Sequence, residues 1–178
     1  MEITKHKQDS AFTTLAGYKT KLAAPRLVKI VISSGTGSGM KRDRNKNEVI
    51  MDRLTRITGQ RPTVRSAKKS VASFKVRQGD PIGVAVTLRG ARMQHFLDKL
   101  INIAIPRTKD FRGIDRKVVD SIGNMTLGIK EHTIFPETSD EDLKDVFGFA
   151  ITIVSTAKGR DEAIRFFEHL GIPFKKEA

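Results

Sequence analysis

One amphipathic segment, Ala91–Ile105, constrains the fold of this chain more than any other feature of its sequence. Its apolar residues recur at the spacing i, i+3, i+4, i+7, i+8 and i+11, which gathers side chains on one face of an α-helix. These residues are Met93, Phe96, Leu97, Leu100, Ile101 and Ala104. Pro106 follows, and we expect it to end the helix because proline lacks the backbone N–H donor. A helix of this kind must bury its apolar face against another layer of structure.

Short segments rich in β-branched residues predict the layer against which that helix packs. They are Leu27–Ser33, Arg61–Ser66, Gly83–Arg89, Leu127–Phe135 and Phe147–Thr156. Two further helices are expected, from Asp43 to Thr58 and from Asp161 to Leu170. Strands mixed with a few helices, without strict alternation, favour an α+β layer fold. We expect a short basic segment over residues 1–24 and a single α+β domain over residues 25–178.

The charge of the chain is distributed unevenly. Residues 1–90 contain 19 Lys and Arg against 6 Asp and Glu, whereas residues 91–178 contain 14 of each sign. The whole net charge of +13 therefore comes from the first half. Such asymmetry indicates a polyanionic partner, and nucleic acid is the reading we favour over an acidic membrane surface or a merely solvated basic surface.

Side chains alternate between the two faces of a strand, so each predicted strand can be divided into an apolar and a polar side. The apolar sides carry Val28, Ile30 and Ile32, then Val64, then Val84, Val86 and Leu88. The polar sides carry Lys29, Ser33, Thr63, Arg65, Thr87 and Arg89. If the first three strands share one sheet, this face offers cations and hydroxyls to phosphates and 2′-hydroxyls. An ordinary solvated face is the alternative.

A long basic segment, Ser66–Ile82, separates the second and third predicted strands. Loops of this length are uncommon unless they are functional or disordered. It contains Lys68, Lys69, Lys75 and Arg77 against Asp80 alone, together with Val71, Phe74 and Val76. We favour a second RNA contact over a mobile surface loop. The chain has no tryptophan and one tyrosine, so we expect recognition of RNA shape and backbone rather than base stacking as the main mode.

Signs of catalysis are weak. The glycine-rich turn Gly35–Gly39 lies between a predicted strand and a helix. However, Met40 occupies the sixth position, where a dinucleotide fingerprint needs glycine, and the Gly-Lys-Ser/Thr of a P-loop is absent. A tight turn with positive φ is the better explanation. The four histidines are scattered, and no cysteine is present. We therefore expect no catalytic residue, metal or cofactor, although a nucleotide-binding enzyme using this turn stays an alternative. The absence of cysteine fits a cytoplasmic protein.

Several long segments resemble bacterial ribosomal large-subunit protein five, the family that binds 5S rRNA. They are PRLVKIVISSGTG (25–37), GQRP (59–62), KSVASFKVRQGDPIG (69–83), VTLRG (86–90), IPRTKDFRG (105–113), GNMTLGI (123–129), IFPE (134–137) and ITIVSTA (151–157). The resemblance implies a compact α+β domain, a mainly antiparallel sheet and helices on one side of it. One departure matters: the family's first strand usually ends Asn-Met-Gly, whereas this one ends Ser33-Ser34-Gly35.

The resemblance also implies partners. It assigns 5S rRNA contacts to Lys29, Gln60 and Thr87, and to Ser33 in place of the family asparagine. It likens the 66–83 loop to the loop that touches P-site tRNA, with contributions from Lys68, Lys69, Ser70, Phe74, Lys75, Arg77 and Gln78. A contact to a small-subunit head protein would fall within residues 109–145, and large-subunit rRNA and neighbouring proteins are further partners. A non-ribosomal RNA-binding protein stays the second alternative.

Overall fold

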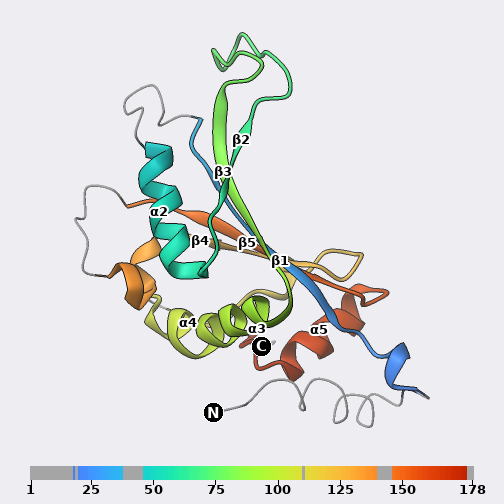
Figure 1. Cartoon of the computed structure of the whole chain (residues 1–178). Helices are drawn as coiled ribbons and strands as arrows, with labels where there is room; N and C mark the ends of the chain where they lie inside the picture. Colours follow the sequence, from blue (N-terminus) through green and yellow to red (C-terminus); the bar gives the residue numbers. More distant parts are fainter. Residues whose placement is uncertain (1–17, 19, 38–45, 110, 140–145, 176–178) are drawn as a thin grey trace. The chain divides into compact units, whose positions relative to one another are not determined.

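The computed structural model describes residues 18, 20–37, 46–109, 111–139 and 146–175. The strands are β1 (Leu27–Gly35), β2 (Thr63–Ser66), β3 (Pro81–Leu88), β4 (Met125–Ile129) and β5 (Phe149–Ser155). They form one five-stranded sheet in the order β2-β3-β1-β5-β4 (Figure 1). The helices are α2 (Lys46–Thr58), α3 (Gly90–Lys99), a π-helical turn (Leu100–Ala104), α4 (Ile105–Arg107) and α5 (Arg160–His169). Short 3-10 turns lie at Lys21–Ala23, Arg116–Val118, His132–Ile134 and Pro136–Thr138. The predicted α+β fold is confirmed.

Two compact units make up the chain. The first contains residues 1–30, 89–127 and 152–178, and the second contains residues 31–88 and 128–151. Strands β1, β4 and β5 contribute residues to both units. The single domain expected over residues 25–178 stays a prediction.

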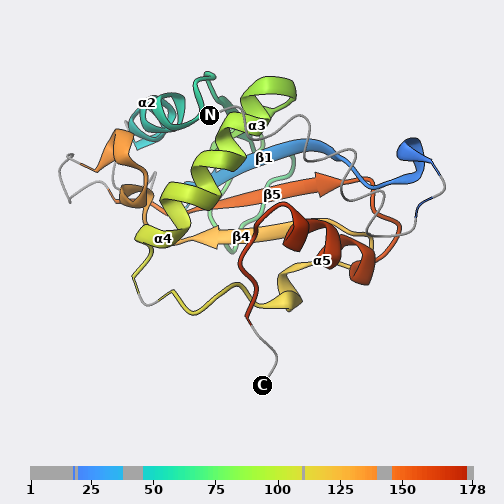
Figure 2. The ribbon, with the colours of Figure 1, turned by 90° about the horizontal axis from the view of Figure 1, so that it is seen from below.

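In the first unit, α3 and α5 lie over one face of the β1, β5 and β4 strands (Figure 2). Met93, Phe96 and Leu97 of α3 are buried, as the helical spacing predicts. Helix α5 buries Phe166 and Phe167 in the same way. Burying each large apolar side chain stabilises the unit by about 1.5–3 kcal/mol relative to leaving it exposed, so these faces hold the helices on the sheet.

In the second unit, α2 packs against β3. Its buried residues Ile50, Leu54 and Ile57 follow the predicted spacing, and the predicted start at Asp43 lies outside the described residues. The same helix carries a buried cation, since Arg53 is 8% exposed and its Nη1 lies 3.0 Å from Nε2 of the fully buried His132. A buried guanidinium needs such acceptors because desolvation penalises an unpaired charge.

The prediction that Pro106 ends the third helix is wrong. Helical structure runs from Gly90 through the π turn Leu100–Ala104 and on to Arg107. Proline removes a backbone donor and its ring crowds the carbonyl four residues earlier, and a π turn is one way to relieve both. The helix ends at Arg107, and the hydroxyl of its C-cap residue Thr108 donates to the Ala104 carbonyl at 3.3 Å.

Two valines assigned to the buried face are exposed instead. Val64 is 42% exposed and Val28 is 36% exposed. Every residue of β2 is exposed, because this four-residue strand is at the edge of the sheet and has a neighbour on one side only. Alternation predicts which face a side chain occupies, but an edge strand or a strand end buries neither face fully.

Other strand boundaries shift as well. The strand predicted over 127–135 ends at Ile129, and a 3-10 turn follows at His132–Ile134. Neither Gly35 nor Gly37 has the positive φ expected of a tight turn: Gly35 is the last residue of β1. Gly39 and most of the predicted 1–24 segment lie outside the described residues.

Candidate nucleic-acid interface

Three of the predicted RNA-contacting residues lie on one face of the β2–β3 pair. In the antiparallel register Thr63 faces Ala85 and Arg65 faces Gly83. Because alternate residues of a strand share a face, Thr87 lies on the same side as Ala85. The Thr63 hydroxyl donates to the Ala85 carbonyl at 3.2 Å. We call the residues Gln60, Thr63, Arg65 and Thr87 the β2–β3 polar cluster.

Gln60 joins this cluster through the backbone of β3. Helix α2 ends at Thr58, and Gly59 turns the chain with a φ of +68° that favours glycine. The side-chain amide of Gln60 then donates from Nε2 to the Thr87 carbonyl oxygen at 3.1 Å. Two residues 27 positions apart in the sequence are thereby held next to each other.

Ser33 lies on β1 within the second unit. It is exposed, whereas its neighbours Ile32 and Ser34 are buried. The Ser34 hydroxyl is satisfied internally, because it donates to the Gly148 carbonyl at 2.8 Å. The alternation predicted for this strand is therefore confirmed at Ser33, whose hydroxyl points to the exposed side.

Lys29 and Arg89 belong to the first unit. Lys29 is half-buried and precedes the fully buried Ile30, so its side chain lies on the opposite face of β1 from the core. Arg89 is exposed, immediately after β3, and its Nη1 donates to the Val28 carbonyl at 3.4 Å. Both cations are accessible from solvent.

The basic loop is shorter than predicted and is folded on itself. It spans residues 67–80, because β2 ends at Ser66 and β3 begins at Pro81. Val71 and Val76 form an antiparallel bridge closed by two backbone hydrogen bonds of 2.9 and 3.2 Å. Lys75 completes the turn between them with a φ of +53°. The loop extends past the ends of β2 and β3 as a small hairpin (Figure 1).

The base of this loop is closed by further hydrogen bonds. The Ala67 amide donates to the Asp80 carbonyl at 2.8 Å, and the Gly79 amide donates to the Ala67 carbonyl at 3.0 Å. The Asp80 carboxylate accepts from the Arg77 amide at 2.7 Å. The Ser70 hydroxyl, one of the predicted tRNA-contacting groups, accepts from the Gln78 amide at 2.9 Å. These hydrogen bonds give the loop backbone a defined conformation, from which its Lys and Arg side chains extend.

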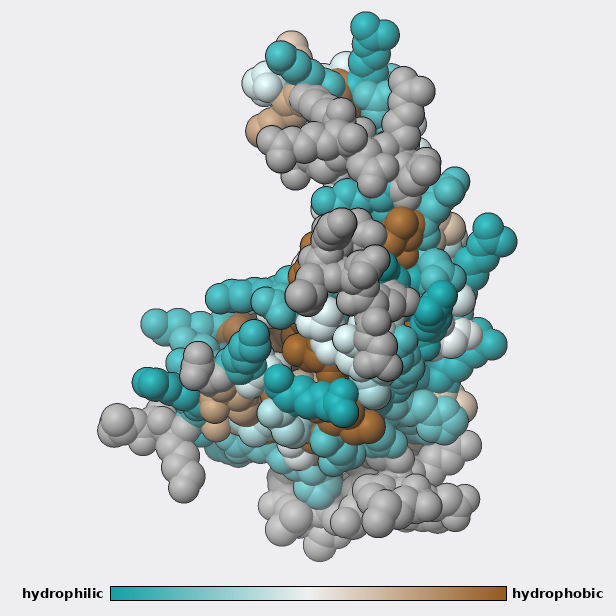
Figure 3. All heavy atoms as spheres, turned by 90° about the vertical axis from the view of Figure 1, so that its left-hand side faces the viewer, coloured by the Kyte–Doolittle hydropathy of each residue, from teal (hydrophilic) through white to brown (hydrophobic). Residues whose placement is uncertain are grey.

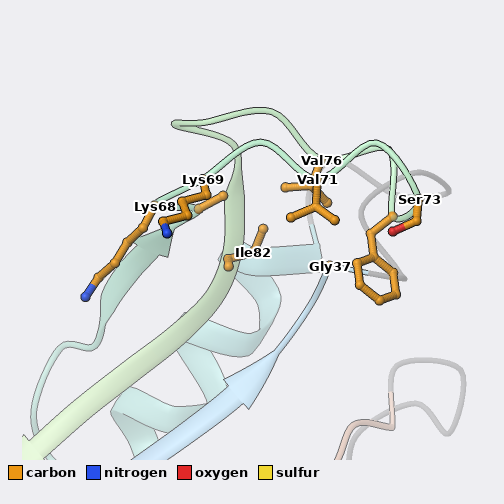
Figure 4. Close-up of a pocket in the computed structure, with 9 residues that line it drawn as sticks. Gly37, Lys68, Lys69, Val71, Ser73, Val76 and Ile82 are labelled. Atoms are coloured by element: carbon orange, nitrogen blue, oxygen red, sulfur yellow. The ribbon is translucent and has the colours of Figure 1, made fainter.

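A hollow of about 870 Å³ lies beneath this hairpin. Figure 4 shows Val71 and Val76 on the two limbs, Ile82 of β3 below them, and Lys68 and Lys69 to one side. The remaining lining residues are Gly37, Ala67, Ser73 and Phe74. In the space-filling view the loop carries brown and tan hydrophobic atoms beside teal hydrophilic ones (Figure 3).

Comparison with known proteins identifies the family to which this surface belongs. Residues 21–77 match the family model for ribosomal protein L5, and residues 81–174 match the model for the C-terminus of the same ribosomal family. The chain belongs to the L5 family of ribosomal proteins. The family named by resemblance from the sequence is confirmed.

Curated L5 relatives resemble almost the whole chain. The large ribosomal subunit protein uL5 of Natranaerobius thermophilus is 48% identical over 162 residues, covering 89% of this chain and 88% of the relative. That of Kosmotoga olearia is 49% identical over 160 residues, covering 90% and 87%. That of Thermotoga maritima is 47% identical over 163 residues, covering 89% and 86%. The chain is therefore a structural protein of the large ribosomal subunit in the cytoplasm, with ribosomal RNA and ribosomal proteins as partners.

Among the described residues, no three or more His, Asp or Glu side chains gather as metal ligands would. His132 is fully buried beside Arg53 and stacks on Phe147 with ring centroids 4.5 Å apart. No described helix has the length and apolar character needed to cross a membrane.

Sequence reasoning missed two features of this L5 surface. The hydrogen bond from Gln60 to Thr87 was not foreseen, because it depends on how β2 and β3 pair. The hollow was also missed, although the apolar Val71, Phe74 and Val76 in an otherwise basic loop were a signal for it.

Proposed function

We propose that this chain anchors 5S rRNA in the central protuberance of the large subunit. The contact residues are Lys29, Ser33, Gln60, Thr63, Arg65, Thr87 and Arg89. The observation that carries the proposal is the register of β2 and β3, which puts the exposed Thr63 and Arg65 on the same side of the strand pair as the half-buried Thr87. Gln60 is bonded to the Thr87 carbonyl. Two paired strands present such groups at the spacing set by their register, which suits a folded RNA.

The proposed mechanism is electrostatic and geometric, without catalysis. Lys29, Arg65 and Arg89 neutralise phosphates and release condensed counterions, which supplies affinity. The hydroxyls of Thr63 and Thr87 and the amide of Gln60 hydrogen-bond to phosphate and sugar oxygens, which fixes the orientation of the RNA. The side chain of Gln60 is held beside Thr87 before RNA arrives, so little ordering entropy is lost on binding.

The loop 67–80 would contact a second RNA, the P-site tRNA. Its proposed contact residues are Lys68, Lys69, Ser70, Phe74, Lys75, Arg77 and Gln78. Four cations against one carboxylate make the loop attractive to phosphates, and all these side chains are exposed. A contact to a small-subunit head protein within residues 109–145 and contacts to large-subunit rRNA complete the proposed set of partners.

Filter binding to 5S rRNA over a series of salt concentrations tests the first contact. Arg65→Ala should weaken binding and lower the slope of log affinity against log salt by about 1, because one phosphate contact is lost. Lys117→Ala removes an exposed lysine of the first unit that the proposal does not use, and it should leave the slope unchanged. Equal slopes for wild type and Arg65→Ala would contradict the proposed contact.

A second variant separates the two RNA sites. Replacing Lys68, Lys69, Lys75 and Arg77 together with alanine should spare 5S rRNA affinity, because these residues lie on the loop and not on the β2–β3 polar cluster. Binding of tRNA to ribosomes reconstituted with this variant should weaken. A large loss of 5S affinity would show that the loop belongs to the same site.

A further inference from the structure

The hollow beneath the loop combines an apolar lining with cations at its side. Val71, Val76 and Ile82 supply aliphatic surface, and Lys68 and Lys69 lie at one side of it (Figure 4). The Phe74 side chain also lines it and is 72% exposed. A large aromatic ring exposed in this way beside exposed aliphatic groups is a typical feature of binding sites.

We propose that the hollow binds one unpaired nucleobase of the RNA that the loop contacts, with neighbouring phosphates of that RNA on Lys68 and Lys69. This inference rests on the proposed contact between the loop and RNA, and it names the part of that RNA which enters. The occupant is a nucleotide that has left its stack, because a paired base cannot turn its flat face toward Phe74.

Charge favours a nucleotide over an apolar peptide as the occupant. The loop 67–80 carries Lys68, Lys69, Lys75 and Arg77, and Asp80 is its only acidic residue. RNA supplies apolar planar bases and negative charges along one chain, which matches the apolar lining of the hollow and the lysines beside it. A cavity of about 870 Å³ also falls in the range of small-molecule sites, about 300–1,000 Å³.

The backbone of the loop indicates how a base would be recognised. The Val71 and Val76 amides donate to each other's carbonyls, and the amides of Arg77 and Gln78 donate to Asp80 and Ser70. These amides are satisfied within the loop and are not available to read the edge of a base. Recognition therefore proceeds through stacking and apolar contact, which every base can make, so we expect little preference among the four bases.

The hollow is formed before the ligand binds. The bridge between Val71 and Val76 and the bonds of Ala67 to Gly79 and Asp80 fix the loop from its tip to its base. A preformed site loses little conformational entropy on binding. A base can thus enter without ordering the loop first.

The test uses the full-length chain and two short RNA hairpins. One carries a single bulged 2-aminopurine, and the other has the same length with every base paired. Wild type should bind the bulged hairpin about tenfold more tightly than the paired one, since stacking of one base contributes on that order. Binding should also shield the 2-aminopurine from quenching by acrylamide.

Two variants at one position isolate stacking from charge. Phe74→Ala should abolish the preference for the bulged hairpin and the shielding, and Phe74→Tyr should keep both. Because Phe74 is 72% exposed, neither change removes much buried apolar surface. Replacing Lys68 and Lys69 with alanine should weaken binding of both hairpins.

The outcomes distinguish this inference from the function on which it rests. If wild type binds both hairpins equally and Phe74→Ala changes nothing, the base site is refuted, while a loss in the lysine variant would still support the loop as an RNA contact. If the lysine variant binds both hairpins as wild type does, the RNA contact of the loop fails as well. Saturable binding of an acidic phenylalanine-containing peptide, abolished by Phe74→Ala and without a bulge preference, would assign the hollow to a protein and overturn the proposal.

Discussion

Replacing Gly83 with alanine tests the strand arrangement that positions the proposed 5S contact. Gly83 lies in β3 opposite Arg65 of β2. On its other side β3 neighbours β1, and a Cβ built at Gly83 would lie 2.9 Å from the backbone oxygen of Ser34. This is closer than carbon and oxygen atoms pack, and the obstructing atom belongs to the backbone of a central strand. The sheet must therefore shift locally to accept even a methyl group.

The expected magnitude follows from two opposing terms. Inserting a group into a well-packed region costs about 1–3 kcal/mol. Replacing glycine by alanine inside a strand returns about 0.5–1 kcal/mol, because the unfolded chain loses conformational freedom. We therefore expect Gly83→Ala to lower the free energy of unfolding by about 1 kcal/mol, which is the difference between the centres of these two ranges.

Urea denaturation followed by far-ultraviolet circular dichroism measures this loss. With a denaturant slope of about 1–3 kcal/mol per molar urea, the midpoint should fall by roughly 0.3–1 M. Gly35→Ala is the matched control, because Gly35 also lies in a strand, has no positive φ, and has nothing within 4 Å of a built Cβ. Its midpoint should stay the same or rise slightly.

The comparison between the two alanine variants decides the matter. Equal midpoints would refute the reasoning, because only Gly83 is approached by the Ser34 carbonyl. A fall in midpoint for Gly35→Ala alone would likewise contradict the close approach of the Ser34 carbonyl to Gly83.

Three further predictions concern single side chains. Burial, and then the hydrogen bond of its hydroxyl to Glu162, raise the pKa of Tyr18 from 10.0 to about 12. The stabilisation from this contact is thus fully present below pH 10 and is lost as the pH rises through 12. Absorbance titration measures the pKa of Tyr18 directly, because the chain has one tyrosine. Glu162→Gln should lower the midpoint of this titration. A wild-type midpoint near 10 would contradict this. His132→Phe keeps the ring stack on Phe147 but removes an acceptor of the buried Arg53. Urea denaturation should therefore show a free energy of unfolding lower by about 1.5–3 kcal/mol. An unchanged midpoint would be inconsistent with that hydrogen bond. Lys75→Gly and Lys75→Ala both remove a charge, but only glycine adopts the φ of +53° without strain. Trypsin should therefore cleave the loop of the alanine variant faster than that of the glycine variant. Equal rates would argue against the left-handed turn.

Local patterns in the sequence predicted the elements and their buried faces well. The spacing of Met93, Phe96 and Leu97 fixes one face of α3 because an α-helix has a constant period, and no distant residue is needed to read it. The alternation along β1 likewise separated Ser33 from the buried Ile32. Boundaries were less accurate, since the length of a strand depends on whether a neighbour pairs with it.

The same limit explains what the sequence could not reveal about the candidate site. Thr63 and Thr87 are both visible as polar strand residues, but their common face depends on the register between β2 and β3. The exposure of Val64 follows from the place of β2 at the sheet edge, which no pattern within four residues encodes.

The sequence by itself was sufficient to locate the positive charge in the first half of the chain, to predict the helices and strands from their periods, and to predict the family. Only the tertiary structure decided which polar side chains meet, how Gln60 reaches Thr87, and how the loop folds over Ile82 to form a hollow. The physical reason is that periodicity is a property of neighbouring residues in one element. Register, edge exposure and cavities arise from contacts between residues far apart in the chain, and these are fixed when the layers pack.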